Sequence, residues 1–522
     1  MLIHQAIDYQ ARRRPGATAI MANEGTFSYL DLKMKSLALA YGLLKLNVTP
    51  GERIGLLGQN TAAHMFAFTA CSRIGAVAVP LNYRLAPPES AYVCDDSHMR
   101  IIIALEPSVE SLAREIISCR ENETILVSDF SKTDCALSDM LAEVSQSDMQ
   151  IPNLGDEQAP VVQLYTSGTT GKPKGAELSH RNFSSLMTSL VAANPGVLGV
   201  EGVDLVCAPM FHIGGSGSTI VPLLCGGRVI IHEAFQPAAV LEAIQTHHIK
   251  NMFMVPAMIL SLLRDVPNFE DYDLSSLKVI GYGAAPISPT LLAEAVERFK
   301  CGFNQYYGMT ETCGTVVALT PEAHLRALAG EPELLQAAGQ PCLGVEAKVC
   351  DSEGNELLCG ETGEIWLRSP QNMLSYYNLP EATRKTVSEG WVLTGDAGYI
   401  NEEGFLFLRD RIKDMVVTGG ENVYPVEVEN VISQLPGVRE VAVVGIPDAK
   451  YGEALLAVIA MNPETEAPTS EALIDFCRGK LAGYKIPRKL EIVPALPRNP
   501  TGKIQKMVLR EPYWQNTERK IG

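Results

Sequence analysis

Residues 165–175 read Tyr-Thr-Ser-Gly-Thr-Thr-Gly-Lys-Pro-Lys-Gly, and the apolar run Val161–Leu164 comes directly before them. The run predicts a buried strand. Glycine lets backbone N–H groups converge on one point. Converging N–H groups together with hydroxyl and lysine donors indicate a loop that binds a polyphosphate. The alternative is a flexible turn between two strands. Such a turn does not need two lysines, and Pro173 fixes φ where a loose turn would not.

This stretch is not a Walker A loop. That motif needs two glycines separated by four residues, then a lysine and a Ser or Thr. Here Gly168 lies three residues before Gly171, and Lys172 is followed by Pro173. The hydroxyl that would hold magnesium is missing, so another part of the chain must bind the metal.

Length and composition limit the classes of protein. A chain of 522 residues exceeds what one hydrophobic core usually supports, so two or more domains are expected. A formal net charge of −17 disfavours binding to nucleic acid or to an anionic membrane. Residues 1–6 show no secretory signal, and we expect a cytoplasmic protein. The long uncharged stretch 205–227 is broken by prolines and glycines, which predicts loop and short strand and no membrane span.

The twelve cysteines form no CxxC pair, and the histidines show no metal-ligand spacing. This pattern predicts reduced core cysteines and no structural metal site.

Strand and helix patterns alternate along the chain, which favours a layered α/β fold with a parallel sheet. The first 150 residues contain no polar set that suggests chemistry, and we interpret them as scaffold. After the loop, further rounds of strand and helix end in glycine-rich or polar segments, at the strand ends where an α/β sheet collects ligands. These segments are 209–217, 281–286 and 303–312.

Six motifs in this order resemble the adenylate-forming superfamily of acyl-CoA synthetases, luciferases and peptide-synthetase adenylation domains, and the resemblance covers nearly the whole chain. The motifs are the loop at 166–175, Tyr307–Glu311, Leu393–Asp396, Arg411–Asp414, Gly419–Asn422 and Asn499–Lys503.

The resemblance implies a large multi-layer α/β domain with parallel-rich sheets (1–410), a hinge (411–414) and a small mobile α+β domain (415–522). It also implies a two-step reaction: a carboxylic acid and ATP form acyl-AMP and pyrophosphate, and coenzyme A then displaces AMP. ATP, Mg²⁺ and coenzyme A are therefore the expected small molecules, with neither nucleic acid nor a membrane span involved. A homodimer is compatible with the resemblance.

The resemblance also implies roles for individual residues. Glu311 is the expected magnesium ligand, and a lysine at 503 can neutralise charge that builds on the α-phosphate. Lys413 is the expected pivot. The expected catalytic residues are Lys503, Glu311, Thr310 and His212. The expected nucleotide-binding residues are Thr166, Ser167, Gly168, Thr169, Thr170, Lys174, Gly283, Ala284, Ala285, Asn304, Tyr307, Gly308, Asp396 and Arg411. For coenzyme A they are Gly419, Gly420, Glu421, Tyr484 and Lys485, although a solvated loop is an equal alternative for the last two.

In peptide-synthetase domains an aspartate pairs with the ammonium group of the substrate, usually in the segment that corresponds to 209–217. This segment carries no carboxylate here, so the resemblance disfavours an amino-acid substrate. His212 matches the gate beside the carboxylate site, and a core histidine is its alternative. The other expected wall residues are all uncharged: Ile213, Gly214, Gly215, Met254, Gly281, Met309, Cys313 and Gly314. Such a wall favours a medium- or long-chain fatty acid, with an aromatic or alicyclic acid as the alternative.

Three rival functions stay open. An acyl-AMP ligase would load a carrier protein in place of coenzyme A. A luciferase-type oxygenase would share the nucleotide residues. A nucleotide-sensing protein would keep the fold without turnover, but Glu311, Asp396 and Lys503 are all present, which argues against it.

Overall fold

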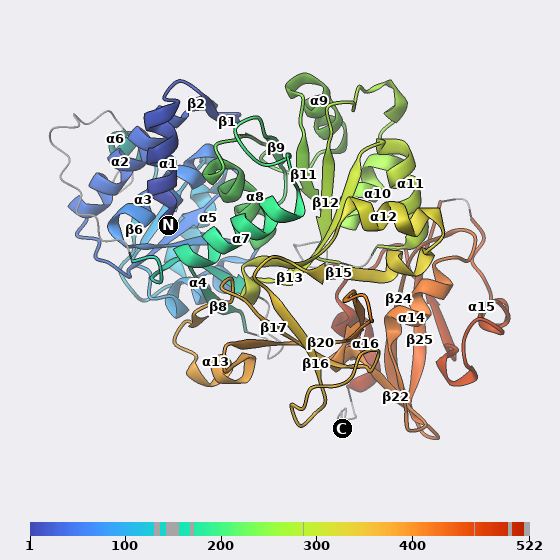
Figure 1. Ribbon diagram of the computed structural model, residues 1–522. Helices are drawn as coiled ribbons and strands as arrows, with labels where there is room; N and C mark the ends of the chain where they lie inside the picture. Colours follow the sequence, from blue (N-terminus) through green and yellow to red (C-terminus); the bar gives the residue numbers. More distant parts are fainter. Residues whose placement is uncertain are drawn as a thin grey trace.

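The computed structural model describes residues 1–129, 136–141, 156–166, 172–285, 287–463, 465–498 and 504–515. It is α/β, with a large N-terminal part and a small, separate C-terminal part (Figure 1). The predicted fold class is confirmed. None of the helices in the described ranges is both long and apolar enough to cross a membrane.

The first described sheet has the strand order β18-β8-β7-β4-β3-β5-β6. Its strands from β7 to β6 run parallel, and β8 and β18 join antiparallel at one edge. Helices α1, α2 and α3 pack on one face and α4 and α5 on the other, so the central strands are apolar on both sides. The strands are β3 (Arg53–Leu57), β4 (Val77–Leu81), β5 (Ile101–Ala104), β6 (Ile125–Val127), β7 (Pro160–Thr166), β8 (Lys174–Ser179) and β18 (Ser375–Tyr376). The helices are α1 (Ile3–Arg13), α2 (Tyr29–Lys45), α3 (Ala62–Ile74), α4 (Pro87–Asp96), α5 (Glu110–Ser118) and α6 (Leu137–Leu141).

The second described sheet changes from parallel to antiparallel along its width. Its parallel half contains β1 (Thr18–Ala22), β9 (Val203–Val206), β10 (Arg228–Ile231), β11 (Asn251–Met254), β12 (Val279–Gly283) and β13 (Gly302–Met309), with β2 (Gly25–Ser28) antiparallel at the edge. Its antiparallel half contains β14 (Gly314–Leu319), β15 (Ala337–Pro341), β16 (Glu346–Cys350), β17 (Gly363–Arg368), β19 (Val387–Ser388), β20 (Trp391–Ile400) and β21 (Leu406–Arg411).

Helices cover both faces of the parallel half, as a buried parallel sheet requires. Residues of α9, α10 and α11 share one core cluster with this sheet, and α7 and α8 contribute to another. These helices are α7 (His180–Ala193), α8 (Ile213–Leu224), α9 (Pro237–His247), α10 (Pro256–Asp265) and α11 (Pro289–Phe299). Helix α12 (Pro321–Ala329) packs with β14, β15 and β21, and α13 (Pro380–Thr386) contacts β18, β19 and β20.

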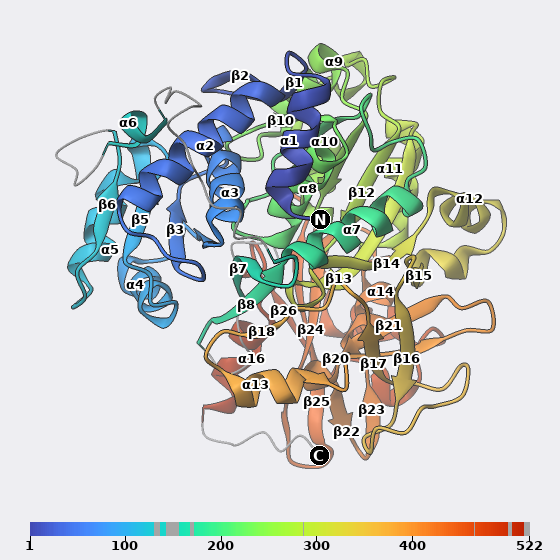
Figure 2. The ribbon, with the colours of Figure 1, turned by 60° about the vertical axis from the view of Figure 1, so that its left-hand side comes forward.

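The third described sheet belongs to the small C-terminal part, at the bottom of Figure 2. Helices α14 and α15 pack on one face of it and α16 on the other. The elements are β22 (Val416–Thr418), β23 (Glu421–Val423), β24 (Val438–Asp448), β25 (Gly452–Met461), β26 (Lys489–Ile492), α14 (Pro425–Ile432), α15 (Ser470–Cys477) and α16 (Lys506–Trp514). The exact domain limits 1–410 and 415–522 stay a prediction.

The interpretation of 205–227 as loop and short strand is wrong in part, because α8 occupies its centre. The glycines that argued against a helix are needed for packing. A Cβ at Gly215 would lie 2.2 Å from the carbonyl oxygen of Pro209, and one at Gly214 would lie 3.0 Å from the Phe253 ring. Helix propensity is here overridden by close contact with neighbouring backbone and ring.

Candidate active site

A cavity of about 1780 Å³ opens at the carboxyl ends of the parallel strands. This volume exceeds that of a pocket for one drug-sized ligand, so it has room for a nucleotide beside a second molecule. Both large sheets contribute to its wall, and so do residues of the hinge and of α16. The expected site residues on the wall are Thr166, Lys174, His212, Ile213, Gly214, Gly215, Ala284, Gly308, Met309, Thr310, Glu311, Gly314, Arg411 and Lys413.

The region of the cavity that is expected to bind the phosphates lies where β7 and β8 meet. Thr166 and Lys174 are antiparallel partners at the two ends of the glycine-rich loop, and both line the cavity. The Lys174 ammonium nitrogen lies 4.7 Å from the centre of the Tyr376 ring. The expected phosphate ligands Ser167, Gly168, Thr169 and Thr170 lie outside the described residues.

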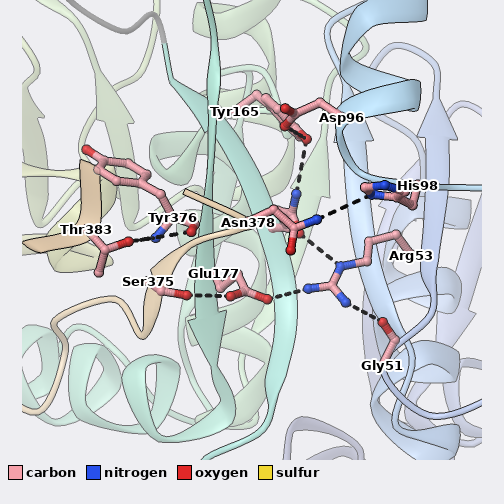
Figure 3. Close-up of polar contacts among 11 residues, drawn as sticks. Gly51, Arg53, Asp96, His98, Tyr165, Glu177, Ser375, Tyr376, Asn378 and Thr383 are labelled. Atoms are coloured by element: carbon pink, nitrogen blue, oxygen red, sulfur yellow. Dashed lines mark hydrogen bonds and ion pairs between the residues drawn. The ribbon is translucent and has the colours of Figure 1, made fainter. Parts of the chain in front are cut away.

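Side-chain contacts anchor the two strands that flank the loop (Figure 3). The Tyr165 hydroxyl donates to Asp96 Oδ2 at 2.7 Å. On the other flank Glu177 forms an ion pair with Arg53 and accepts a hydrogen bond from the Ser375 hydroxyl at 2.6 Å. These contacts hold β7, β8 and the segment with Tyr376 against the same scaffold.

Glu311 is a buried carboxylate on the cavity wall, with 6 % of its surface exposed. Its Oε1 accepts a hydrogen bond from the Tyr376 hydroxyl at 2.5 Å. Burial and the negative charge of Glu311 raise the pKa of Tyr376, so this hydroxyl stays protonated and keeps donating. Sequence reasoning missed Tyr376. Tyr376 reaches Glu311 because β18 pairs with β8, and no local sequence pattern reveals that pairing.

Asp396 and Arg411 are paired residues on β20 and β21. Arg411 Nε lies 2.6 Å from Asp396 Oδ1, and the Tyr307 hydroxyl donates to Asp396 Oδ2 at 2.7 Å. Arg411 lines the cavity beside Thr394 and Gly395. This carboxylate is thus oriented from two sides, as a group that holds two sugar hydroxyls would need to be.

The residues expected around adenine do not all line the cavity. Ala284 lines the cavity in a left-handed conformation with φ of 65°, whereas Gly283, Ala285, Asn304 and Tyr307 lie outside the wall. The Asn304 amide donates to Asn194 Oδ1 at 3.0 Å, and its own Oδ1 has no hydrogen-bond partner among the described residues.

Three residues expected on the acid-binding wall lie elsewhere. Met254 is fully buried in a core cluster, and Phe253 faces the cavity instead, because successive strand residues point to opposite faces. Gly281 is covered by the Tyr306 ring, which a Cβ would approach to 2.4 Å. Cys313 is fully buried in another core cluster.

The remaining expected wall residues surround the start of α8. His212 is the residue before the helix, and its ring centre lies 4.5 Å from that of Phe211. Leu186 and Leu190 of α7, Val221 of α8 and Phe253 of β11 add an apolar surface.

The cavity wall also contains charged residues that sequence reasoning did not place there. The first 150 residues, interpreted as scaffold, contribute Arg84 and Glu89. Asp204 of β9 lines the cavity as well, a charged residue that the expected wall did not include. A charged residue inside a short apolar strand was the available signal.

The small C-terminal part reaches the cavity through Gln505 and Met507. Lys503 itself lies outside the described residues. The hairpin residues Gly419, Gly420 and Glu421 are exposed and do not line the cavity in this arrangement.

The two residues with an uncertain coenzyme A role differ in their surroundings. Lys485 binds both carboxylate oxygens of Glu427 at 2.7 Å, so its charge is already paired, and Tyr484 is 41 % exposed.

In the described ranges, no group of three or more His, Cys, Asp or Glu side chains lies together in a way that could hold a metal ion.

Comparison with known proteins identifies the family. Residues 7–377 match the family model described as AMP-binding enzyme, and residues 427–503 match the AMP-binding enzyme C-terminal domain. The chain is 36 % identical to a fatty acid–[acyl-carrier-protein] ligase of Streptomyces coeruleorubidus over 525 residues, 99 % of this chain and 97 % of the relative. It is 34 % identical to a feruloyl-CoA synthase of an Amycolatopsis species, with 97 % of each chain covered. It is 35 % identical to a long-chain-fatty-acid–CoA ligase of Mycobacterium tuberculosis, with 90 % of each covered.

Solved structures agree with this result. The amide bond synthetase of Marinactinospora thermotolerans superposes with a TM-score of 0.88 at 31 % identity, covering 97 % of this chain and 99 % of that one. The O-succinylbenzoate coenzyme A synthetase of Bacillus subtilis in complex with ATP and magnesium gives 0.82 at 30 % identity, covering 97 % and 98 %. This chain belongs to the family of AMP-binding enzymes, the adenylate-forming superfamily that its six motifs resemble.

Proposed function

We propose that this chain is an ATP-dependent carboxylic acid–CoA ligase that acts on a medium- or long-chain fatty acid or another hydrophobic monocarboxylate. One observation carries the proposal. A single cavity is lined by Lys174, Glu311 and Arg411, by the apolar surface of α7, α8 and β11, and by residues of α16. Nucleotide, acid and the lysine-bearing domain can therefore meet in one place.

The residues present fit Mg²⁺ and ATP. The carboxylate oxygens of Glu311 are the hard ligands that Mg²⁺ prefers, and Tyr376 holds one of them in place. Lys174 supplies positive charge at the mouth of the loop, and Asp396 is held for the ribose hydroxyls by Tyr307 and Arg411. When bound, Mg²⁺ neutralises phosphate charge and orients the phosphates for in-line displacement.

In the first half-reaction a carboxylate oxygen of the acid forms a bond to the α-phosphorus of ATP, and the bond to the bridging oxygen breaks, releasing pyrophosphate. The loop and Lys174 bind the departing phosphates. The ammonium group of Lys503 neutralises the charge that builds at the α-phosphate. Gln505 and Met507, just beyond Lys503, already lie on the cavity wall, so this domain orientation suits the first half-reaction.

In the second half-reaction the thiolate of coenzyme A attacks the acyl carbonyl carbon, and AMP leaves. A lysine at the α-phosphate would obstruct the thiol, which favours rotation of the small domain about Lys413 between the steps. The exposed hairpin Gly419–Glu421 would then turn toward the cavity. The 1–410 and 415–522 boundaries are part of this proposal.

The apolar wall between α7, α8 and β11 supports a hydrophobic acid, and a relative named as a long-chain-fatty-acid–CoA ligase agrees with it. The relative named as a feruloyl-CoA synthase supports an aromatic acid as the second candidate. The relative named as a fatty acid–[acyl-carrier-protein] ligase supports a carrier protein as an alternative acceptor.

Pyrophosphate release tests the proposal, measured with ATP and Mg²⁺ across a panel of fatty and aromatic acids, with and without coenzyme A. Acid-dependent release together with thioester formation is expected. Release with no thioester, followed by acylation of an added carrier protein, would replace coenzyme A with that acceptor. No release with any acid, from protein that still binds ATP, would overturn the proposal.

A further inference from the structure

Asp204 is a buried carboxylate on the cavity wall that the two-step reaction does not use. It is 3 % exposed and lies on β9 beside the apolar residues Val203 and Leu205. Its Oδ1 accepts a hydrogen bond from the Asn251 amide at 2.6 Å. Its Oδ2 has no hydrogen-bond partner among the described residues.

This arrangement costs stability unless something compensates for it. A buried carboxylate oxygen without a donor loses its hydration and gains nothing in return. Burial raises the pKa of Asp204 to about 7, with only Asn251 acting in the opposite direction. An aliphatic residue would suit this strand position better, so the carboxyl group points to a ligand.

The position of Asp204 places it deep in the cavity. The acid's carboxyl group is expected at the carboxyl ends of the strands, near His212 and Met309. Asp204 lies two residues before Val206, the last residue of β9, so at the usual strand rise it is about 7 Å below the carboxyl end of the strand. Asn251 is its register partner on β11 and also lines the cavity.

We propose that Asp204, assisted by Asn251, forms a subsite for a hydrogen-bond donor at the end of the acid remote from its carboxyl group, so that the preferred substrate carries a distal hydroxyl or amino group on a hydrophobic body. The inference rests on the proposed ligase function and refines its substrate class. The donor bonds to the Asp204 carboxyl group, and the apolar wall contacts the body of the acid. A plain hydrocarbon chain would leave this carboxyl group without a donor. A site built for a hydroxyl discriminates against an acid that lacks it for this reason.

The test compares matched acids on wild type and variants. A homologous series of straight-chain acids is assayed with and without a terminal hydroxyl, together with terminal amino analogues and aromatic acids with and without a ring hydroxyl. Pyrophosphate release gives kcat/KM for each. At the length that reaches Asp204, wild type is expected to prefer the donor-bearing acid by about 10- to 100-fold, as for a hydrogen bond to a charged group. The hydroxyl and amino arms decide which donor is used.

Asp204→Leu is expected to abolish or reverse this preference, and Asp204→Asn, which keeps the shape, is expected to weaken it. Met258→Leu is the matched control on the apolar wall, and it should change both acids of a pair in the same proportion. Non-hydrolysable acyl-adenylate analogues with and without the hydroxyl give a second readout, the ligand-induced rise in Tm of each protein.

Two results overturn the inference while the proposed function stands. Either wild type uses both acids of every pair equally, or Asp204→Leu and Asp204→Asn both keep the wild-type preference. If no acid of any class releases pyrophosphate, the proposed function itself has failed, which is a different outcome.

Discussion

The Tyr376 hydroxyl donates a hydrogen bond of 2.5 Å to Oε1 of Glu311, from a strand 65 residues farther along the chain. The contact joins an edge strand of the first sheet to the polar turn that ends β13 of the second. Both large sheets therefore contribute to the orientation of the expected magnesium ligand.

Tyr376→Phe removes this donor and keeps the ring beside Lys174. The Mg²⁺ concentration for half-maximal pyrophosphate release should rise by about 10- to 100-fold, the usual cost of losing a hydrogen bond to a metal ligand. Tyr377→Phe, at a ring that stacks on Arg53, is the control and should leave the Mg²⁺ dependence unchanged. An unaltered Mg²⁺ titration for Tyr376→Phe would contradict this role.

Asp396→Ala tests ribose recognition. Wild type should use ATP better than 2′-deoxy-ATP or 3′-deoxy-ATP by about 10-fold or more, because a hydrogen bond to a charged group stabilises by about 1.5–3 kcal/mol. Asp396→Ala should lower kcat/KM for ATP and make the kcat/KM values for the three nucleotides similar. The ratio between nucleotides is the internal control, since general damage would lower all three alike. A variant that keeps the wild-type ratio would show that Asp396 does not contact the sugar.

Lys503→Ala should separate the two half-reactions. Acyl-AMP formation is expected to fall by about 10²- to 10³-fold, the usual effect of losing one preorganised group that stabilises transition-state charge. Conversion of supplied acyl-AMP and coenzyme A to thioester should stay near the wild-type rate. Lys489→Ala, at an exposed lysine of β26, controls for general loss of charge. Equal losses in both steps would remove the distinction.

Lys506 ties the small domain to the end of β21. Its ammonium nitrogen lies 2.8 Å from Glu429 Oε1 and 3.5 Å from Asp410 Oδ2, and the two carboxylates raise the pKa of Lys506 against the opposing effect of burial. Burial raises the pKa of Asp410 to about 6, although Lys506 opposes this. Lys506→Met leaves both carboxylates without their cation and should destabilise the fold by about 3–5 kcal/mol near neutral pH.

The destabilisation caused by Lys506→Met should be smaller at acidic pH. Without Lys506 the folded-state pKa of Asp410 rises further above the unfolded value, so the folded state takes up protons as pH falls and regains stability. Thermal unfolding of wild type and Lys506→Met at about pH 5 and about pH 8 measures this. A Tm difference that is the same at both pH values would contradict it.

Asp204→Asn should stabilise the unliganded protein above neutral pH. The folded-state pKa of Asp204, about 7, lies above the ordinary value of 3.8. The contribution of Asp204 to the stability of wild type is therefore fully present below about pH 4 and is lost as pH rises through about 7. A neutral amide avoids this loss, which at about 1.4 kcal/mol per pKa unit amounts to roughly 4 kcal/mol. The Tm of Asp204→Asn should exceed that of wild type at about pH 8 and approach it in acid. Parallel Tm profiles across this range would show that the carboxyl group does not titrate as proposed.

The sequence by itself determined the class of fold and the family. The strand before the loop and the alternation of strands and helices are local patterns, because periodicity and turn chemistry act over a few residues. The family followed from the resemblance of six motifs in order. The same patterns indicated Glu311, Asp396 and Arg411 by their places within motifs. Lys174 likewise follows from the loop alone.

Only the tertiary structure decided which side chains meet. A period of two shows that Phe253 and Met254 point to opposite faces, but not which face becomes cavity, since that depends on where α8 packs. The contact of Tyr376 with Glu311 and the burial of Asp204 in the cavity wall depend on packing between segments far apart in the chain. Burial of apolar surface drives helices to pack closely on both sheets, and this packing positions these groups. No local sequence pattern encodes the packing.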